Sequence, residues 1–590
     1  MTYRVPLNDI LFSMTHAAGM DRGVADGIYT DLGDGFAGTI LEQAAAFAEG
    51  VLEPINRQGD QNGAKLADGV VTTAPGWKQA YGQWIEGGWA GVTASQEAGG
   101  MGLPHLLDSA CLEMWSSANM AFMLCPMLSS GAILALERHG SEALQQTYLP
   151  KIVSGEWSAT MNLTEPQAGS DLAALRTRAE KQADGTYRVF GQKIFITYGE
   201  HDMAENIVHL VLARLPDAPA GTRGISLFLV PKYLPGANGA LGALNDVRCH
   251  SLEHKMGIHA SPTCTMIYGD QDGAVGYIVG EENKGLACMF TMMNNARLGV
   301  GLQGVALAEL ATQKAIDYAN ERRQGRATGF SGQGMSPIAL HPDVRRMLLT
   351  MKSSTAAARA ICYMTAEAID RSHRAEDADA RKQAGERASL LTPVAKAFST
   401  DIGNEVTSLG VQVHGGMGFI EETGAAQFMR DARIAAIYEG TNGIQAIDLV
   451  QRKLPLSNGE TVAREIADMR AVVADVAKVN DPAFGATAAR LGECIDALEV
   501  ATRYMLDALA ARPDDALAGA TPYLRLFGLA RGGTALARMG LAALNANGHE
   551  AHVDIARFFA ENLCVGGKGL EWTVTGGAAS VHTAERALAS

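Results

Sequence analysis

The sequence predicts a mainly α-helical protein with a β domain in the middle of the chain and an extra helical domain at its C-terminal end. Three observations lead to this fold class. Apolar residues recur at three- and four-residue steps up to about Leu149, strand-like apolar runs follow from Trp157, and long helical patterns resume from about Ala287. At 590 residues the chain is several times a typical domain, so we expect more than one hydrophobic core.

Changes of pattern along the chain set the expected domain boundaries. The clearest is the linker from Lys453 to Gly459, where Pro455 and Gly459 favour a break between two helical regions. The four expected domains span residues 1–155, 156–285, 286–455 and 456–590.

Within the first domain the helical pattern begins at Asp34, and Ile40, Leu41 and Ala44 mark one buried face. The run from Met114 to Leu136 carries no charge, so a membrane span must be considered. It contains polar residues and Pro126, and we expect two buried helix segments that meet at Pro126 rather than a span.

The middle domain is expected to consist of strands. The predicted strands are Trp157–Leu163, Tyr187–Phe190, Lys193–Thr197, Asn206–Ala213, Ile225–Val230 and Thr263–Tyr268. The stretch from Pro231 to Leu252 contains several glycines and is predicted to be a long surface excursion.

Three long helices are expected after the β domain, at Ala287–Glu321, Pro342–Asp370 and Ser389–Val413. Patterns of this length without caps are typical of a helical bundle. The charged run from Arg371 to Arg387 is predicted to be a solvated connection between two of them.

Composition excludes several classes of function. With 49 Lys and Arg against 64 Asp and Glu, the net charge of −15 argues against general affinity for nucleic acid or anionic membranes. The eight cysteines are scattered singly, which suits a reducing compartment and predicts neither a disulfide framework nor a metal site. The first residues show no secretory signal pattern, so we expect a cytoplasmic protein.

One carboxylate, Glu439, stands on a turn where a long helical region ends, in the stretch Ile437 to Gly443 that reads Ile-Tyr-Glu-Gly-Thr-Asn-Gly. A carboxylate acts as a general base only when it is held at its substrate and partly stripped of water. An aromatic neighbour and a Gly-Thr turn favour both conditions. On its own the local pattern favours a solvated carboxylate at a helix end, and the motifs upstream reverse this interpretation.

Two further motifs lie upstream. Residues 163–171 read Leu-Thr-Glu-Pro-Gln-Ala-Gly-Ser-Asp, and residues 191–197 read Gly-Gln-Lys-Ile-Phe-Ile-Thr. With the Glu439 turn and the order of helices, strands and helices, they resemble the acyl-CoA dehydrogenase family of flavoproteins from about Asp34 to Arg452. The resemblance implies that family's fold, with an α domain, a β-barrel-like domain and a helical bundle, and FAD as cofactor.

Matching the family's motifs residue by residue implies a set of cofactor contacts. Phe195 matches a position whose aromatic ring covers the flavin, and Arg322 matches an arginine that binds the pyrophosphate. In this family the neighbouring subunit supplies some of the residues that bind the cofactor. The implied FAD contacts are Leu163, Thr164, Ser170, Phe195, Thr197, Arg322, Gln412, Gly415, Gly416 and Thr441.

The resemblance also implies the chemistry. Glu439 is the implied base that removes a proton from Cα of an acyl-CoA while a hydride leaves Cβ, and its backbone N–H is an implied donor to the thioester oxygen. Ser170, Arg297, Tyr438 and Gly440 are the implied substrate contacts. An electron-transfer flavoprotein is the expected electron acceptor, and a homodimer is the expected assembly.

The stretches Gly199–Asn206 and Lys255–Cys264 and the C-terminal unit look like the branch acting on 3-(methylthio)propanoyl-CoA in bacterial breakdown of dimethylsulfoniopropionate. We therefore expect 3-(methylthio)acryloyl-CoA as product. Three alternatives stay open: a general short- to long-chain fatty acyl-CoA dehydrogenase of β-oxidation, an oxidase of the same fold, and a weakly active DNA-binding member. Acidic residues outnumber basic ones beyond Pro455, which disfavours the last.

Overall fold

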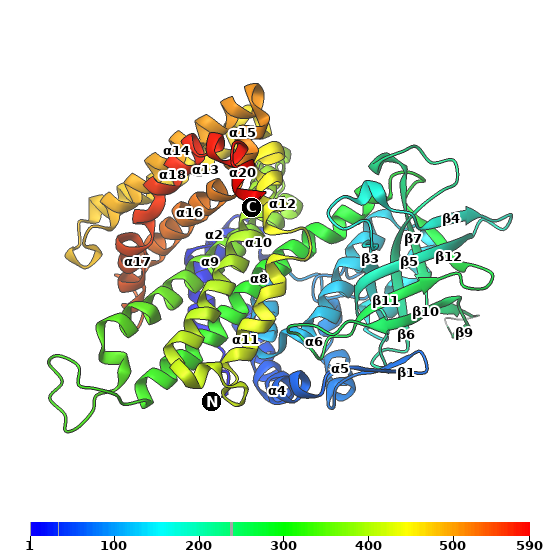
Figure 1. The fold of residues 1–590 in the computed structure, drawn as a ribbon, viewed down its shortest axis with the longest axis horizontal. Coiled ribbons are helices and arrows are strands. Elements are labelled where there is room, and N and C mark those ends of the chain that lie inside the picture. The colour runs from blue at the N-terminus through cyan, green and yellow to red at the C-terminus, as the bar shows by residue number, and fades with distance from the viewer. Residues whose placement is uncertain (1, 34, 237–239, 590) are drawn as a thin grey trace. The chain divides into compact units, whose positions relative to one another are not determined.

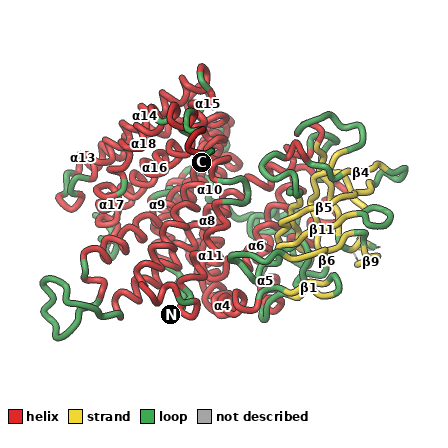
Figure 2. The backbone as a smooth tube through the Cα atoms, in the orientation of Figure 1, coloured by secondary structure: helices red, strands yellow, loops and turns green. Residues whose placement is uncertain are grey.

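The computed structural model describes residues 2–33, 35–236 and 240–589 (Figure 1). The protein is mainly helical, and the strands of its large sheet lie between Trp157 and Val279 (Figure 2), as the sequence predicts. Contacts divide the chain into two compact units. One comprises Met1–Ala45, His105–Ser117 and Arg297–Ser590, and the other comprises Ala46–Pro104 and Ala118–Ala296.

Helices dominate the first part of the chain. They are α1 (Leu7–His16), α2 (Met20–Ala25), α3 (Phe36–Phe47), α4 (Glu53–Asn62), α5 (Trp77–Glu86), α6 (His105–His139) and α7 (Glu142–Val153). A two-stranded hairpin of β1 (Lys65–Ala67) and β2 (Val70–Thr72) interrupts them. The sequence pattern missed this hairpin because strands of three residues are too short to show a period.

Helix α6 is long and apolar enough to cross a membrane, with a hydropathy of 1.6, but 89% of that apolar window is buried inside the protein. It is therefore a core helix. The break expected at Pro126 is wrong, because Pro126 stays inside the helix and the non-helical residue is Asn119. The Asn119 side chain accepts a hydrogen bond from the Phe122 N–H (3.1 Å), so it caps the second half of α6.

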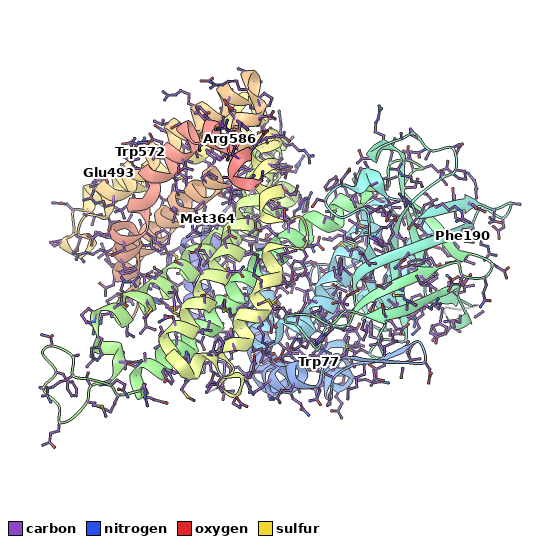
Figure 3. The ribbon with its side chains drawn as sticks, viewed as in Figure 1. Trp77, Phe190, Met364, Glu493, Trp572 and Arg586 are labelled. Carbon is purple, nitrogen blue, oxygen red and sulfur yellow. The ribbon has the colours of Figure 1, made fainter. Side chains whose placement is uncertain are left out.

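The large sheet has the strand order β10-β11-β5-β12-β7-β6-β3, with β4 beside β5 and β6. Its strands are β3 (Trp157–Asn162), β4 (Arg178–Lys181), β5 (Tyr187–Thr197), β6 (Asn206–Arg214), β7 (Ile225–Pro231), β10 (Val247–Leu252), β11 (Thr263–Tyr268) and β12 (Ala274–Val279). Strands β3 and β6 are parallel. Trp77 of α5, labelled in Figure 3, packs in the same unit and donates a hydrogen bond to the Tyr198 hydroxyl (3.1 Å).

The prediction of a surface excursion from Pro231 to Leu252 is wrong. This stretch contains β8 (Tyr233–Pro235), β9 (Leu241–Leu244) and β10, and β10 pairs with β11 at the edge of the large sheet. Residues 237–239 lie outside the described residues. Buried and exposed residues alternate in β10, but the glycines that precede it favoured a loop interpretation of the whole stretch.

Three long helices form the bundle: α8 (Gly285–Glu321), α9 (Pro342–Arg374) and α10 (Ala378–His414). The connection expected from Arg371 to Arg387 is much shorter, because α10 already begins at Ala378. Two of its arginines are paired: Arg371 bonds Glu367 (2.7 Å) and Arg387 bonds Glu465 (2.9 Å). Other charged residues of the run, such as Glu376 and Lys382, are exposed.

The remaining helices complete the same unit. They are α11 (Ala425–Ala432), α12 (Asn442–Asp448), α13 (Glu460–Val479), α14 (Thr487–Ala511), α15 (Pro513–Ala518), α16 (Ala520–Ala543), α17 (Ala551–Asn562), α18 (Gly567–Gly576), α19 (Ala578–His582) and α20 (Glu585–Leu588). Helix α16 packs against α9 and α10, and Arg525 of α16 bonds Glu405 of α10 (2.8 Å) and covers the Phe398 ring. The C-terminal helices are therefore joined to the bundle through α16.

Candidate active site

The Glu439 turn links the short helix η10 (Arg433–Ala436) to α12. Glu439 and Gly440 have φ angles of +57° and +83°, so two successive residues adopt the left-handed region. That region is unfavourable for a glutamate by about 1–2 kcal/mol. A side chain at position 440 would also come within 2.8 Å of the Gln445 amide, so glycine is required there.

Several hydrogen bonds hold this strained turn. The buried Gln445 amide donates to the carbonyl oxygens of Glu439 (3.2 Å) and Gly440 (3.3 Å). The Thr441 hydroxyl accepts from the Ile444 N–H (3.2 Å) and so caps α12. A strained residue persists only when its surroundings fix it, and such residues cluster at functional sites.

Asn442, the first residue of α12, ties the turn to α10. Its amide group donates to the Asp401 carboxylate (2.7 Å) and the Ala397 carbonyl (3.2 Å). Its oxygen accepts from the Lys396 ammonium (2.8 Å). The orientation of α12, and with it the end of the Glu439 turn, is thereby set by the middle of α10.

The charges of two cations act on Glu439. Burial raises the pKa of its carboxyl group to about 7, and Arg297 and Lys396 act against that rise. Arg297 comes from α8, is only 7% exposed, and lies 3.9 Å from the Asp448 carboxylate. A carboxyl group with a pKa near 7 can both accept and hold a proton at neutral pH, which is what a general base needs.

Tyr438 forms one wall of the turn. Its hydroxyl donates to the Gln303 side chain on α8. Burial raises the pKa of Tyr438 far above its ordinary value, so it remains a neutral phenol. It can therefore shape the site but cannot serve as a base.

In the other compact unit, the structure brings together the cofactor residues expected on the loop after β3 and on β5. The Thr164 carbonyl accepts from the Ile194 N–H (2.9 Å), and the Lys193 ammonium donates to the Leu163 carbonyl (2.9 Å). Lys193 also pairs with the buried Glu165 carboxylate (2.8 Å). This loop is therefore fastened to the strand that carries Phe195 and Thr197.

Phe195 lies at a bulge in β5. The register with β11 shifts between Cys264 and Met266, which places two residues of β5 opposite one residue of β11. Phe195 has a φ of +60° and its side chain is 59% exposed. A bulge re-aims a side chain. An exposed aromatic held in this way fits the role of covering a flat ring, as expected for the flavin.

Ser170 is exposed on the loop beyond Ala168, and the next residue, Asp171, caps a short turn with its carboxylate. Within the loop, the N–H groups of Glu165 and Ala168 each donate to the other's carbonyl (3.0 Å). Ser170 therefore follows a closed, well-fixed segment and presents its hydroxyl on the surface.

Thr441, another expected cofactor residue, follows Glu439 and Gly440 directly, whereas Arg322, Gln412, Gly415 and Gly416 lie far along the bundle from Glu439. Helices α8 and α10 run side by side (Figure 1): Gly304 packs on Ser399, and near the helix ends Tyr318 stacks on His414 at 4.4 Å. Arg322 directly follows α8, and Gln412, Gly415 and Gly416 end α10. From Lys396 to Gln412 the helix rises about 24 Å, at about 1.5 Å per residue.

The far end of the bundle has the features that a phosphate-rich ligand needs. Arg322 and Gln412 are exposed. Gly415 has a φ of +61°, and a side chain at Gly415 or Gly416 would meet no atom within 4 Å, so the glycine turn leaves open space beside its backbone. His414, by contrast, is buried with its Nδ1 bonded to the Gly410 carbonyl (2.7 Å), which makes it a packing residue.

Sequence reasoning missed the residues that support the site. Lys396 and Asn442 were given no role, nor was the Glu165–Lys193 pair. A signal for Lys396 exists, because it is the one charge in the helical stretch Leu390–Thr400. Buried lysines are rare unless they are paired, so a lone lysine in an apolar stretch marks a position worth examining.

Four family models match most of the chain. They are described as "Acyl-CoA dehydrogenase, N-terminal domain" at residues 38–156, "Acyl-CoA dehydrogenase, middle domain" at 160–270, "Acyl-CoA dehydrogenase, C-terminal domain" at 283–454 and "Acetyl-CoA dehydrogenase C-terminal like" at 465–585.

Named relatives cover most of the chain as well. The chain is 47% identical over 559 residues to "3-methylmercaptopropionyl-CoA dehydrogenase" of Ruegeria pomeroyi, covering 95% of this chain and 94% of that protein. It is 36% identical over 507 residues to a "Butyryl-CoA dehydrogenase" of Syntrophomonas wolfei, covering 84% and 82%. It is 35% identical over 474 residues to "Broad-specificity linear acyl-CoA dehydrogenase FadE5" of Mycobacterium tuberculosis, covering 78% and 77%.

Solved structures share the fold over nearly the full length. ACDH-11 of Caenorhabditis elegans, solved with C11-CoA, aligns with a TM-score of 0.76 at 19% identity, covering 93% of this chain and 92% of that one. An acyl-CoA dehydrogenase of Bacillus anthracis, solved with FAD, aligns with a TM-score of 0.75 at 22% identity, covering 92% and 88%. The C-terminal helical domain is thus part of the shared fold. The chain belongs to the acyl-CoA dehydrogenase family, flavin-dependent oxidoreductases that act on a CH–CH bond, and its cofactor is FAD.

Proposed function

We propose that the protein oxidises 3-(methylthio)propanoyl-CoA to 3-(methylthio)acryloyl-CoA, with Glu439 as the base. The observation that carries the catalytic assignment is the Glu439 carboxyl group, which is held on a strained turn, has its pKa raised by burial, and feels the charges of Arg297 and Lys396. No structural need for a glutamate at φ +57° is apparent, so a chemical role accounts for the strain.

The reaction removes a proton from Cα and a hydride from Cβ, and a carbon–carbon double bond forms between them. When bound, FAD supplies the acceptor for the hydride. Glu439 takes the proton from Cα onto its carboxylate, and its backbone N–H donates to the thioester oxygen as negative charge builds there. The Tyr438–Gln303 hydrogen bond and the Gln445 amide keep the turn in place during this transfer.

Several segments supply the proposed cofactor contacts. The fastened loop with Leu163, Thr164 and Ser170 offers backbone and hydroxyl groups, and the exposed Phe195 ring offers a flat surface beside Thr197. Arg322 and the glycine turn at Gly415 suit the pyrophosphate, since a guanidinium binds phosphate oxygens in a bidentate manner. Arg297, Tyr438 and Gly440 remain our substrate-contact residues.

The choice of substrate is supported by the relative from Ruegeria pomeroyi, which is named for the same thioether acyl group and matches this chain nearly end to end. A general fatty acyl-CoA dehydrogenase is the alternative, because butyryl-CoA and broad-specificity enzymes match over most of the chain too. The two functions differ in how far the acyl pocket extends beyond Cβ.

A DNA-binding role is disfavoured by the C-terminal helices. Their basic side chains largely face carboxylates: Arg470 bonds Asp496 and Glu499, Arg531 bonds Glu465, and Lys568 bonds Glu571. Cations that are already paired within the protein offer little to phosphates. Tight, salt-sensitive binding to random duplex DNA at physiological salt would reverse this conclusion.

We further propose a homodimer that passes electrons to an electron-transfer flavoprotein in the cytoplasm. The separation of Arg322 and Gly415 from Glu439 along the bundle supports a second copy as the source of these two cofactor contacts. All eight cysteines are free and buried, which suits a reducing compartment. Release of peroxide at rates matching an artificial-acceptor assay would identify an oxidase instead.

The substrate assignment is tested by kcat/KM for 3-(methylthio)propanoyl-, butanoyl-, octanoyl- and palmitoyl-CoA. We expect the thioether substrate to be used at least as well as butanoyl-CoA and better than the two long chains, because a pocket for a short acyl group closes a few atoms beyond Cβ. A general enzyme would instead gain up to about 0.8 kcal/mol per buried methylene. Preference for octanoyl- or palmitoyl-CoA would overturn the thioether assignment and leave the family unchanged.

A further inference from the structure

Lys396 occupies a position that would be costly for an unpaired charge. It lies in the middle of α10, its side chain has no exposed surface, and apolar residues precede and follow it along the helix. Transfer of an ammonium group from water into such surroundings is unfavourable unless the charge is compensated. The groups that compensate the charge of Lys396 therefore indicate its role.

The direct partner of Lys396 is Asn442, whose oxygen accepts a hydrogen bond from the ammonium at 2.8 Å. Asn442 stands three residues after Glu439, on the first turn of α12. Thr400 and Asp401, one turn further along α10, bond the same side chain (3.2 and 2.7 Å). Lys396 therefore holds the residue that anchors the far side of the catalytic turn.

The charge partner of Lys396 is Glu439 itself. Burial lowers the pKa of Lys396 to about 7, and the largest influence opposing that change is the Glu439 carboxylate, followed by Asp401. The interaction is mutual, since Lys396 is one of the two cations that act against the raised pKa of Glu439. The other is Arg297 on α8, which shares its charge with Asp448.

Other charged groups influence Asp401, Arg297 and Tyr438. Asp401 also interacts with Glu405 and with Arg525 of α16, and Arg297 interacts with Arg452. Tyr438 adds a phenol next to Asp431 of α11. Among the described residues, Arg297 and Lys396 are the cations whose charges act against the raised pKa of Glu439.

We propose that Lys396 is a positioning residue for the dehydrogenation: its ammonium group fixes Asn442 and the Glu439 turn, and its charge keeps Glu439 ionised and ready to accept the Cα proton. This inference rests on the proposed role of Glu439 as base. The roles of the two residues can be separated. Asn442 only positions the Glu439 turn, whereas Lys396 both positions the turn and supplies a positive charge.

The test uses the full-length FAD-loaded enzyme and the pH dependence of flavin reduction by acyl-CoA under anaerobic conditions. Lys396→Gln retains a donor for Asn442 and removes the charge. We expect the midpoint of its rate profile to move up by about one pH unit or more, because an opposite charge close by shifts a carboxyl pKa by about 1–3 units. Lys396→Arg keeps the charge and should restore the wild-type midpoint.

Matched controls separate this role from a purely structural one. Lys352→Gln removes a partly buried lysine of the same unit, which pairs with Asp9 at 2.8 Å, and should lower the melting temperature without moving the midpoint. Asn442→Ala should slow flavin reduction at every pH and leave the midpoint nearer to that of the wild type than Lys396→Gln does.

The outcomes are distinguishable. An unchanged midpoint in Lys396→Gln would overturn the inference about Lys396, even if Glu439→Gln is inactive. Full flavin reduction in Glu439→Gln would overturn the proposed function itself. If Lys396→Gln failed to fold, Lys396→Arg would decide. A wild-type midpoint in Lys396→Arg would support the proposal, and a midpoint shifted by about one pH unit or more would contradict it.

Discussion

Glu165 and Lys193 form a fully buried ion pair in the β domain, at the base of the loop that precedes Ser170. The Glu165 carboxylate also accepts hydrogen bonds from the N–H groups of Arg176 (2.7 Å) and Thr177 (3.0 Å). Although burial alone would raise it, the pKa of Glu165 falls to about 2 because of Lys193 and these donors. The pair therefore closes both ends of the cofactor loop onto β5.

Glu165→Gln should loosen this loop and weaken FAD retention. Removing one partner leaves the buried Lys193 uncompensated, at a cost of about 3–5 kcal/mol. We expect faster hydrogen–deuterium exchange over residues 163–177 and loss of flavin on gel filtration. Lys181→Gln, which breaks the exposed pair with Glu282 in the same domain, is the control and should change little.

The same pair sets an acid limit. A carboxyl group with a folded-state pKa below its ordinary value of 4.5 stabilises the protein above that value, and the stabilisation is lost as pH falls toward about 2. Protection of the loop should therefore decline through that window in the wild type. A decline of equal size in Glu165→Gln would show that another group is responsible.

At this scale the sequence predicted the chemistry better than its support. Glu439 was predicted because the family motif around it is present in this chain. Lys396 and Asn442 were not, because their role depends on α10 and α12 meeting across about 46 positions of sequence, and no periodicity reveals such a pairing. Phe195 was expected to cover a ring, but its bulge and positive φ could only be seen in the fold.

At the scale of elements, α6 shows how local patterns mislead. Proline suggested the break, yet α6 passes through Pro126 and is interrupted at Asn119 instead. Asn119 both caps the following segment through Phe122 and donates to the Leu52 carbonyl (3.3 Å). Long amphipathic helices and the central strands were predictable because their periods extend over many residues, whereas β10 and the β1–β2 hairpin depend on partners distant in sequence.

Asn119→Ala should lower the free energy of unfolding by about 1–2 kcal/mol, because the N–H of Phe122 loses its capping acceptor. Thermal unfolding of the FAD-loaded enzyme measures this. Asn119→Ser keeps a capping oxygen and should recover most of the stability. If Asn119→Ala melts at the wild-type temperature while Pro126→Ala does not, the capping role assigned to Asn119 is wrong.

At the scale of the whole molecule, each chain carries the catalytic turn beside the middle of α10 and the expected pyrophosphate residues at the ends of α8 and α10. A site that combines Glu439 of one chain with Arg322 of a second explains both positions. We therefore predict that a dimer lacking either Glu439 or Arg322 in both chains is inactive. Pairing one chain that lacks Glu439 with one that lacks Arg322 should restore activity.

Mixed dimers of Glu439→Gln and Arg322→Ala chains, purified through two different tags, test this arrangement. One site of each mixed dimer carries both substitutions and the other carries none, so we expect about half of the wild-type activity from a two-site symmetric dimer. The two parent homodimers should be far less active. Mixed dimers no more active than the mean of the parents would mean that each site is built within one chain.

The central claim is that Glu439 accepts the Cα proton of an acyl-CoA, and the most direct measurement is stopped-flow flavin reduction by 3-(methylthio)propanoyl-CoA without oxygen. The wild type should reduce its flavin at a rate that rises with pH through about 7, because only the ionised carboxylate is a base. Glu439→Gln should retain FAD and lose a factor of about 10²–10⁴ or more in that rate. Reduction at the wild-type rate by a Glu439→Gln enzyme that has kept its FAD would contradict the account.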